Sequence, residues 1–186
     1  MARLIYLTNM SLDGYIEDER GAFDIFPPDD EVFAFTTDIL RSVGTLLYGR
    51  RLYETMAVWE TDAALAAASD LTAAFAAAWQ AASKVVYSTT LTAAPTVDTR
   101  LERHLDPAAV RELKAGASRD LTVGGANLAA QAIAAGLVDE CQLLVWPWIV
   151  GGGKPALPGG LRADLELLDE RRFGNGVVYL RHRVLT

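Results

Sequence analysis

Cysteine and histidine are scarce in this sequence, and their scarcity excludes several kinds of site. The chain of 186 residues contains one cysteine, Cys141, and two histidines. One cysteine cannot form a disulfide within the chain, and no group of cysteines and histidines has the spacing of a zinc site. We therefore predict no metal site. The lack of a disulfide framework is typical of a protein of the reducing cytoplasm, which is the location we expect.

Basic residues and long apolar runs are also few. The chain has 17 lysine and arginine residues against 24 acidic residues, a net charge of −7, whereas nucleic acids and anionic membranes bind basic surfaces. The longest apolar stretch, residues 63–82, is mostly alanine and is interrupted by Ser69, Asp70 and Gln80. A membrane span is therefore not expected, and the N-terminus lacks the apolar core of a signal peptide. We expect neither nucleic acid nor membrane as a partner.

Short β-prone runs alternate with helical patterns along the chain. Strands are expected at residues 3–7, 45–48, 84–88, 96–101, 120–123 and 139–150. Helices are expected from residues 26–30 to Gly44 and over residues 50–59, 63–82, 107–114 and 126–135. Two last strands, 164–173 and 177–184, flank Gly174-Asn175-Gly176, a strong hairpin signal. The pattern predicts one α/β domain over residues 1–186, with three layers and a mostly parallel central sheet that ends in an antiparallel C-terminal hairpin.

Three strand ends carry residues suited to phosphate, and ligands of parallel sheets bind at the carboxyl ends of strands. The paired glycines Gly124-Gly125 either let a helix pack closely on a strand or let N–H groups of a helix start meet a phosphate. The cations of Gly49-Arg50-Arg51 are either solvated or held at a helix start by an anion. The hydroxyls of Ser88-Thr89-Thr90 serve either a turn or a ligand. Together these three ends predict a dinucleotide across the sheet edge.

The signal for catalysis is weaker. Asp13 belongs to an Asp-Gly turn, and Asp30 and Glu31 follow Asp29 at an expected helix start. One of the helix-start acids could instead face the pocket and protonate a substrate nitrogen. Trp146 is either a core residue or a platform for a flat ring. No serine or cysteine nucleophile has a recognisable motif.

The order of the motifs resembles a known family. The segments are LIYLTNMSLDGYIE, LLYGRRLYETM, VVYSTTL, LTVGGANLAAQAIAAGLVDECQLLVWPWIVGGGKPALP and FGNGVVYLRHRV, and they cover nearly the whole chain. They resemble the dihydrofolate reductase-like superfamily and, within it, the group related to the C-terminal reductase domain of the bifunctional deaminase-reductase RibD of bacterial riboflavin synthesis. The resemblance implies the dihydrofolate reductase-like fold, and it implies a homodimer, which is common in this group.

The resemblance also implies an NADPH-dependent reductase related to 5-amino-6-(5-phosphoribosylamino)uracil reductase. It implies cofactor contacts at Asn9, Gly49, Arg50, Arg51, Ser88, Thr89, Thr90, Gly124, Gly125, Ala126, Asn127 and Leu128. It implies substrate contacts at Leu12, Tyr53, Trp146 and Ile149, and we take Asp13, Asp30 and Glu31 as the candidate catalytic acids. Because the turn at 88–90 has no acidic residue, it suits a 2′-phosphate, which favours NADPH over NADH.

Two departures from the family pattern bear on the substrate. The acids at 29–31 lie early in the first helix, whereas dihydrofolate reductases hold the pterin ring with an acid within it. Val123 stands before the paired glycines, where riboflavin-pathway reductases usually carry an acid. We expect a small heteroaromatic substrate, pterin- or pyrimidine-like, or a carbonyl compound. The alternatives are a nucleotide-binding module that has kept the fold without catalysis, and a structural dimer subunit that binds no cofactor.

Overall fold

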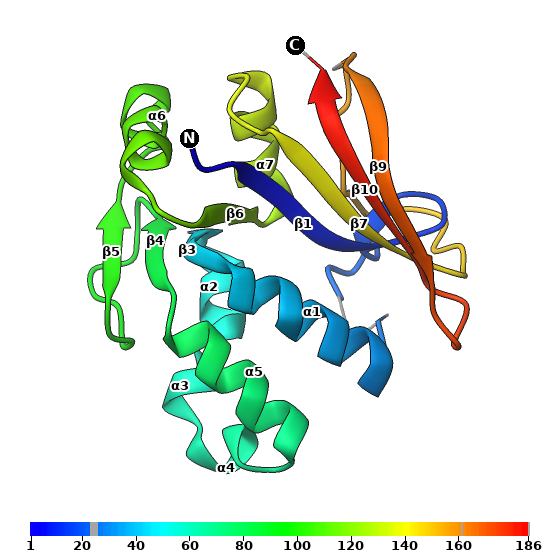
Figure 1. Cartoon of the computed structure of the whole chain (residues 1–186), viewed down its shortest axis with the longest axis horizontal. Coiled ribbons are helices and arrows are strands. Elements are labelled where there is room, and N and C mark those ends of the chain that lie inside the picture. The colour runs from blue at the N-terminus through cyan, green and yellow to red at the C-terminus, as the bar shows by residue number, and fades with distance from the viewer. Residues whose placement is uncertain (23–25, 161, 186) are drawn as a thin grey trace.

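The centre of the protein is an eight-stranded sheet that takes strands from both ends of the chain (Figure 1). The structure is a computed structural model, and it describes residues 1–22, 26–160 and 162–185. The strand order is β5-β4-β3-β6-β1-β7-β10-β9. The bounds are β1 (Leu4–Ser11), β3 (Val43–Gly49), β4 (Ser83–Tyr87), β5 (Thr99–Glu102), β6 (Asp120–Gly124), β7 (Glu140–Trp146), β9 (Asp164–Arg172) and β10 (Val178–Leu185). All pairs from β5 to β7 are parallel, and β10 runs antiparallel to both β7 and β9. The predicted mostly parallel sheet with an antiparallel C-terminal hairpin is confirmed.

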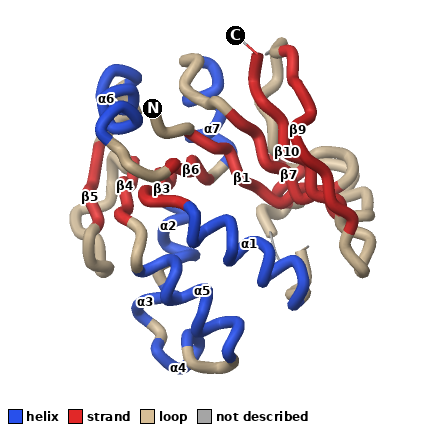
Figure 2. Tube along the Cα trace, viewed as in Figure 1, coloured by secondary structure: helices blue, strands red, loops and turns tan. Residues whose placement is uncertain are grey.

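Helices cover both faces of this sheet (Figures 1 and 2). They are α1 (Asp30–Ser42), α2 (Arg50–Met56), α3 (Val58–Thr61), α4 (Ala63–Ala66), α5 (Asp70–Gln80), α6 (Pro107–Gly116) and α7 (Ala126–Ala134). Successive strand side chains point to opposite faces: Leu47 packs with Val110 of α6 and Leu128 of α7, whereas Leu46 packs with Leu40 of α1 and Trp79 of α5. This burial on both faces makes the three layers. No described helix is long and apolar enough to span a membrane.

Three details differ from the sequence-based expectation. Residues 63–82 form two helices, α4 and α5, because Ser69 caps a new helix: its hydroxyl accepts from the Thr72 N–H while the Thr72 hydroxyl accepts from the Ser69 N–H. The strand expected over 139–150 ends at Trp146, before Pro147, whose ring lacks an N–H for the sheet. Gly44 lies in β3 and does not end α1.

A small second sheet was not predicted. β2 (Tyr15–Glu17) pairs with β8 (Lys154–Pro155). Gly153 immediately precedes β8 with φ +127°, and a Cβ there would overlap the Glu17 carbonyl and the Asp18 backbone. Only glycine therefore permits this close approach. The pairing carries residues 15–17 to the same edge of the main sheet where the parallel strands end.

Candidate active site

Two adjoining cavities lie at the carboxyl edge of the sheet, with volumes of about 380 Å³ and 580 Å³. The first is lined by Gly49, Arg50, Arg51, Leu52, Tyr87, Ser88, Thr89, Thr90, Arg103, His104, Leu105, Gly125, Asn127, Leu128, Gln131 and Lys154. The second is lined by Leu7, Thr8, Asn9, Ile16, Glu17, Phe26, Arg51, Leu52, Glu54, Thr55, Gly125, Ala126 and Lys154. Arg51, Leu52, Gly125 and Lys154 border both. One elongated ligand can therefore reach from one cavity into the other.

The first cavity is rich in cations and hydroxyls. Arg50 donates from Nη1 to the Thr90 hydroxyl at 2.8 Å and from Nε to Glu54 at 2.7 Å. Arg103 donates to the carbonyls of Ser88 and Leu91 at 3.0 and 2.9 Å. Among the described residues, its lining includes no aspartate or glutamate. This corner of an acidic protein is thus suited to an anion.

The turn after β4 uses its hydroxyls in two ways. The Ser88 hydroxyl accepts from the N–H groups of Thr90 and Leu91 at 3.2 and 2.9 Å, so it stabilises the turn. Thr89 is exposed, and the Thr90 hydroxyl accepts from Arg50. Burial raises the pKa of nearby Tyr87 to about 12. Ser88 therefore serves the turn, and the ligand interpretation stays a prediction for Thr89 and Thr90.

The two paired glycines also have different roles. Gly125 has φ +89° and is the N-cap of α7 with no side-chain cap, and a Cβ there would lie 3.9 Å from its nearest neighbours. Its surface faces both cavities. Gly124 is buried, and a Cβ there would come within 2.5 Å of a Leu52 methyl and 3.1 Å of the Tyr48 ring. Gly124 is a packing glycine, and Gly125 keeps backbone open to the cavities.

The second cavity has an apolar floor and a few polar groups. Leu7, Ile16 and Phe26 line it beside Thr8, Asn9 and Glu17. The Trp146 indole N–H donates to the Asn9 side-chain oxygen at 2.9 Å. This bond fixes the orientation of the Asn9 amide and leaves its nitrogen to donate to a ligand.

The structure places the three candidate catalytic acids outside both cavities. Asp13 accepts from the Ser11 hydroxyl and from the N–H groups of Val150 and Gly151, and these bonds, with the Ser11 bond foremost, lower its pKa to about 2. Glu31 accepts from the Gly174 N–H and from Arg171, which lower its pKa. Asp30 is an exposed residue of the first turn of α1. Asp13 and Glu31 therefore hold loops and strands together, and a catalytic role for Asp13, Asp30 or Glu31 stays a prediction.

The four expected substrate contacts also lie outside the cavity linings. Leu12 and Ile149 are 64% and 73% exposed. Tyr53 is buried, with its hydroxyl bonded to the Thr96 hydroxyl at 2.8 Å. Trp146 is buried against Phe26 and Trp148. Its contacts with the site run through Asn9 and Phe26. Of the twelve expected cofactor contacts, Gly124 alone is absent from the lining of both cavities.

Sequence reasoning missed several residues of the site, among them Glu17, Lys154, Arg103 and His104. Glu17 and Lys154 meet only because β2 pairs with β8, across 137 residues of chain. Strands of two and three residues carry no periodicity from which this pairing could be predicted. The triglycine before Lys154 was the one available signal, since consecutive glycines mark a close backbone approach.

The chain matches the family model of the RibD C-terminal domain over residues 2–179, and it belongs to this family. It is 30% identical over 192 residues to "Uncharacterized protein YyaP" of Bacillus subtilis (strain 168), covering 96% of this chain and 93% of that protein.

Solved structures share the fold. A putative riboflavin biosynthesis protein from Shewanella sp. PV-4 has a TM-score of 0.76 and 19% identity, with all of both chains covered. A pyrimidine reductase-like protein from Corynebacterium diphtheriae has a TM-score of 0.67 and 13% identity, covering 100% of this chain and 92% of that one. A diaminohydroxyphosphoribosylaminopyrimidine deaminase/5-amino-6-(5-phosphoribosylamino)uracil reductase from Thermotoga maritima has a TM-score of 0.65 and 15% identity, and only 57% of its chain is covered. At these identities the likeness concerns the fold.

Proposed function

We propose that this protein is an NADPH-dependent reductase that transfers hydride to a small heteroaromatic substrate, pterin- or pyrimidine-like, or to a carbonyl compound. The observation that carries the proposal is the pair of adjoining cavities, one cationic and one with an apolar floor, joined at Gly125. This polarity matches NADPH, whose pyrophosphate and 2′-phosphate are anionic and whose nicotinamide is a flat, uncharged ring at one end. Membership of the RibD C-terminal domain family supports the same class of reaction.

The residues of the first cavity fit the charge of NADPH. The open backbone at Gly125 precedes α7, whose first N–H groups are free for an anion. Arg50 and Arg103, with the Thr90 hydroxyl, offer charge-assisted hydrogen bonds to a phosphate. Among the described residues no acid lines this cavity, which favours the nucleotide with the additional 2′-phosphate.

When bound, NADPH supplies the hydride. The side chains of Leu7, Ile16 and Phe26 give the second cavity an apolar floor, against which the reacting ring would lie. The amide of Asn9, fixed by Trp146, orients a hydrogen-bond acceptor there.

Turnover tests this proposal. The loss of NADPH absorbance is followed with pterins, pyrimidine precursors of riboflavin and quinones, and we expect oxidation with at least one class. Gly125→Asp should abolish both binding and turnover, because a carboxylate would stand where the phosphates approach; thermal unfolding checks that the variant folds. Binding without turnover across the panel would favour the non-catalytic nucleotide-binding module. If NADPH does not bind, the reductase and the nucleotide-binding module are both contradicted, and a structural subunit is favoured.

We also propose that the protein is a homodimer, joined through the edge of its sheet. β9 is the edge strand, and Leu165 and Leu167 on one of its faces are 43% and 54% exposed. An open strand edge with exposed leucines is a surface that proteins usually cover. The family resemblance implies a homodimer, which supports a second copy as the cover.

A further inference from the structure

Glu17 of β2 is a poorly satisfied carboxylate in the second cavity. Its side chain is only 14% exposed. Within the described part of the chain its carboxylate has two long contacts, Oε2 to Arg51 Nη1 at 3.5 Å and Oε1 to Lys154 Nζ at 3.7 Å. Charge-assisted hydrogen bonds are normally 2.7–2.9 Å long. A largely buried carboxylate held this loosely is available to a ligand.

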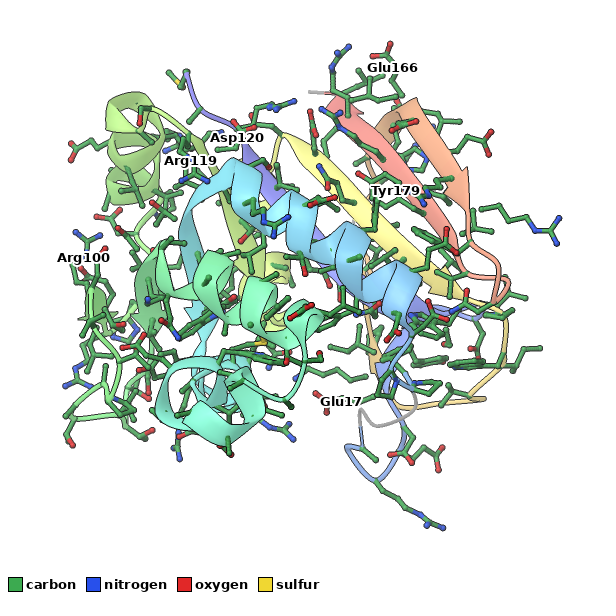
Figure 3. All side chains as sticks on the ribbon, turned by 60° about the horizontal axis from the view of Figure 1, so that its bottom comes forward. Glu17, Arg100, Arg119, Asp120, Glu166 and Tyr179 are labelled. Atoms are coloured by element: carbon green, nitrogen blue, oxygen red, sulfur yellow. The ribbon has the colours of Figure 1, made fainter. Side chains whose placement is uncertain are left out.

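The chain is built to keep Glu17 beside Lys154. The two residues pair directly across β2 and β8, and glycine at 153 is required for that approach. On the other side Arg51 lies in the first turn of α2, beside the first cavity. Figure 3 shows Glu17 on the opposite side of the molecule from Asp120 and Glu166, so the arginines that pair with those two acids do not reach it.

Arg51 and Lys154 are the charged residues that border both cavities in the described chain. A phosphate in the first cavity would offer them shorter and stronger hydrogen bonds than the contacts of 3.5 and 3.7 Å that they make with Glu17. Phosphate and Glu17 therefore compete for the same two cations. Occupation of the first cavity changes what the Glu17 carboxylate can bind in the second.

We propose that Glu17 binds a hydrogen-bond-donating or cationic nitrogen group of the substrate, and that Arg51 and Lys154 couple this binding to the cofactor. The cofactor phosphates draw the two cations from Glu17, and the carboxylate then accepts from the substrate. By linkage, a substrate group that occupies Glu17 strengthens cofactor binding by the same factor. The inference rests on the proposed NADPH site and adds a specificity-determining residue and positive cooperativity between the two ligands.

Opposite effects of two substitutions on NADPH affinity test the competition. Glu17→Gln removes the competitor and should lower the NADPH Kd about fivefold, roughly the value of one ion pair of this exposure. Lys154→Met removes a cation and should raise the Kd. The matched control is Glu19→Gln, the same charge change on a residue that lines neither cavity. Calorimetric titration measures the affinities, and thermal unfolding confirms that each variant is folded.

Benzamidine, an amidinium cation on a flat ring, probes the second half of the proposal. In ligand-observed NMR we expect stronger binding to the wild type with NADPH present than without it, and loss of that gain in Glu17→Gln. Equal or weaker NADPH binding by Glu17→Gln, or benzamidine binding that does not depend on NADPH, would overturn the inference. NADPH failing to bind the wild type would instead overturn the proposed cofactor site itself.

Discussion

Gly124 and Gly125 are adjacent, yet each is glycine for a different physical reason. Gly124 has no room for a Cβ between Leu52 and Tyr48, whereas Gly125 has room but needs a positive φ. The first is a demand of packing between strand and helix. The second leaves backbone open towards both cavities, and the first of these is the proposed place of the cofactor phosphates.

Alanine at each position separates these two roles. Gly124→Ala should lower the free energy of unfolding by about 1–2 kcal/mol through overpacking and keep most of the NADPH affinity. Gly125→Ala should cost about 1–3 kcal/mol through its backbone conformation and also weaken NADPH binding at least about tenfold. Urea unfolding and fluorescence titration measure the two quantities. Equal losses of affinity in both variants would contradict the assignment.

Residues at strand ends were predictable because a strand, its turn and the next helix are neighbours in sequence. Gly49, Ser88 and Gly125 follow from that local pattern. The roles of acids were not predictable in the same way. Asp13 meets Val150 and Gly151, and Glu31 meets Arg171, at separations of 137 to 140 residues. Their partners are set by the tertiary fold, and these partners give both carboxylates a structural role that the sequence did not show.

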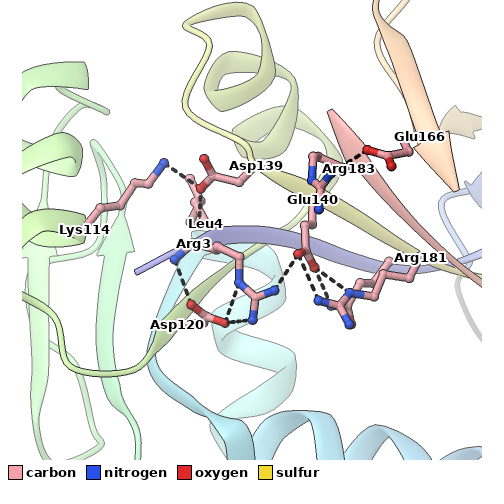
Figure 4. Close-up of polar contacts among 10 residues, drawn as sticks. Arg3, Leu4, Lys114, Asp120, Asp139, Glu140, Glu166, Arg181 and Arg183 are labelled. Carbon is pink, nitrogen blue, oxygen red and sulfur yellow. Dashed lines mark hydrogen bonds and ion pairs between the residues drawn. The ribbon is translucent and has the colours of Figure 1, made fainter. Parts of the chain in front are cut away.

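Among the elements, a buried carboxylate links β7 to β10 and to the residue just before β1 (Figure 4). Glu140 of β7 accepts from Arg3, just before β1, at 2.6 Å, and from Arg181 of β10 at 2.8 and 3.0 Å. Arg3 also pairs with Asp120 of β6. Burial alone would raise the pKa of Glu140, but the hydrogen bonds from Arg181 and the charges of Arg181 and Arg3 outweigh it and hold the pKa below its usual 4.5.

Glu140→Gln should lower the free energy of unfolding by about 3 kcal/mol at neutral pH, because Arg181 loses its charged partner and Arg3 keeps only Asp120. Since the folded pKa is lowered, this stabilisation is fully present above the ordinary pKa of 4.5 and is lost as the pH falls through the lower folded value. The gap between wild type and variant should therefore narrow below about pH 4.5. Chemical unfolding across a pH series measures the gap, and a gap that stays constant into the acid range would refute this role.

Elements with a strong pattern were predictable, and short ones were not. α7 follows a strand and ends before Gly136, close to its expected bounds. The alanine-rich region hid the break at Ser69, because alanine favours helix at every position and a cap is a single-residue signal. β2 and β8 are too short for any period to show. Yet they supply Glu17 and Lys154 to the second cavity.

For the whole molecule, the alternation of strands and helices predicted the three layers. The order of the strands in the sheet could not be predicted from the sequence and is known from the structure. β1 lies between β6 and β7, and the last strand, β10, lies between β7 and the edge strand β9. This order leaves β9 as an edge with exposed leucines. The cytoplasmic location stays a prediction from the cysteine content.

Leu167→Arg should convert the proposed dimer into a monomer, because it places a charge on the leucine-bearing face of β9. The matched control is Leu12→Arg, the same change at a leucine that is 64% exposed and far from β9 in the sequence. Size-exclusion chromatography with light scattering gives the mass of each. A monomeric wild type, or a Leu167→Arg variant that stays dimeric, would rule out this interface.

The most direct test of the account is a calorimetric titration of the wild type with NADPH and with NADH. We predict one NADPH bound per chain, about tenfold more tightly than NADH, the value of one additional charge-assisted contact in a cavity without acids. Arg50→Ala should reduce that preference, since Arg50 lies with Thr90 in the first cavity. Failure of both nucleotides to bind at millimolar concentration would contradict the central claim that these two cavities form a cofactor site.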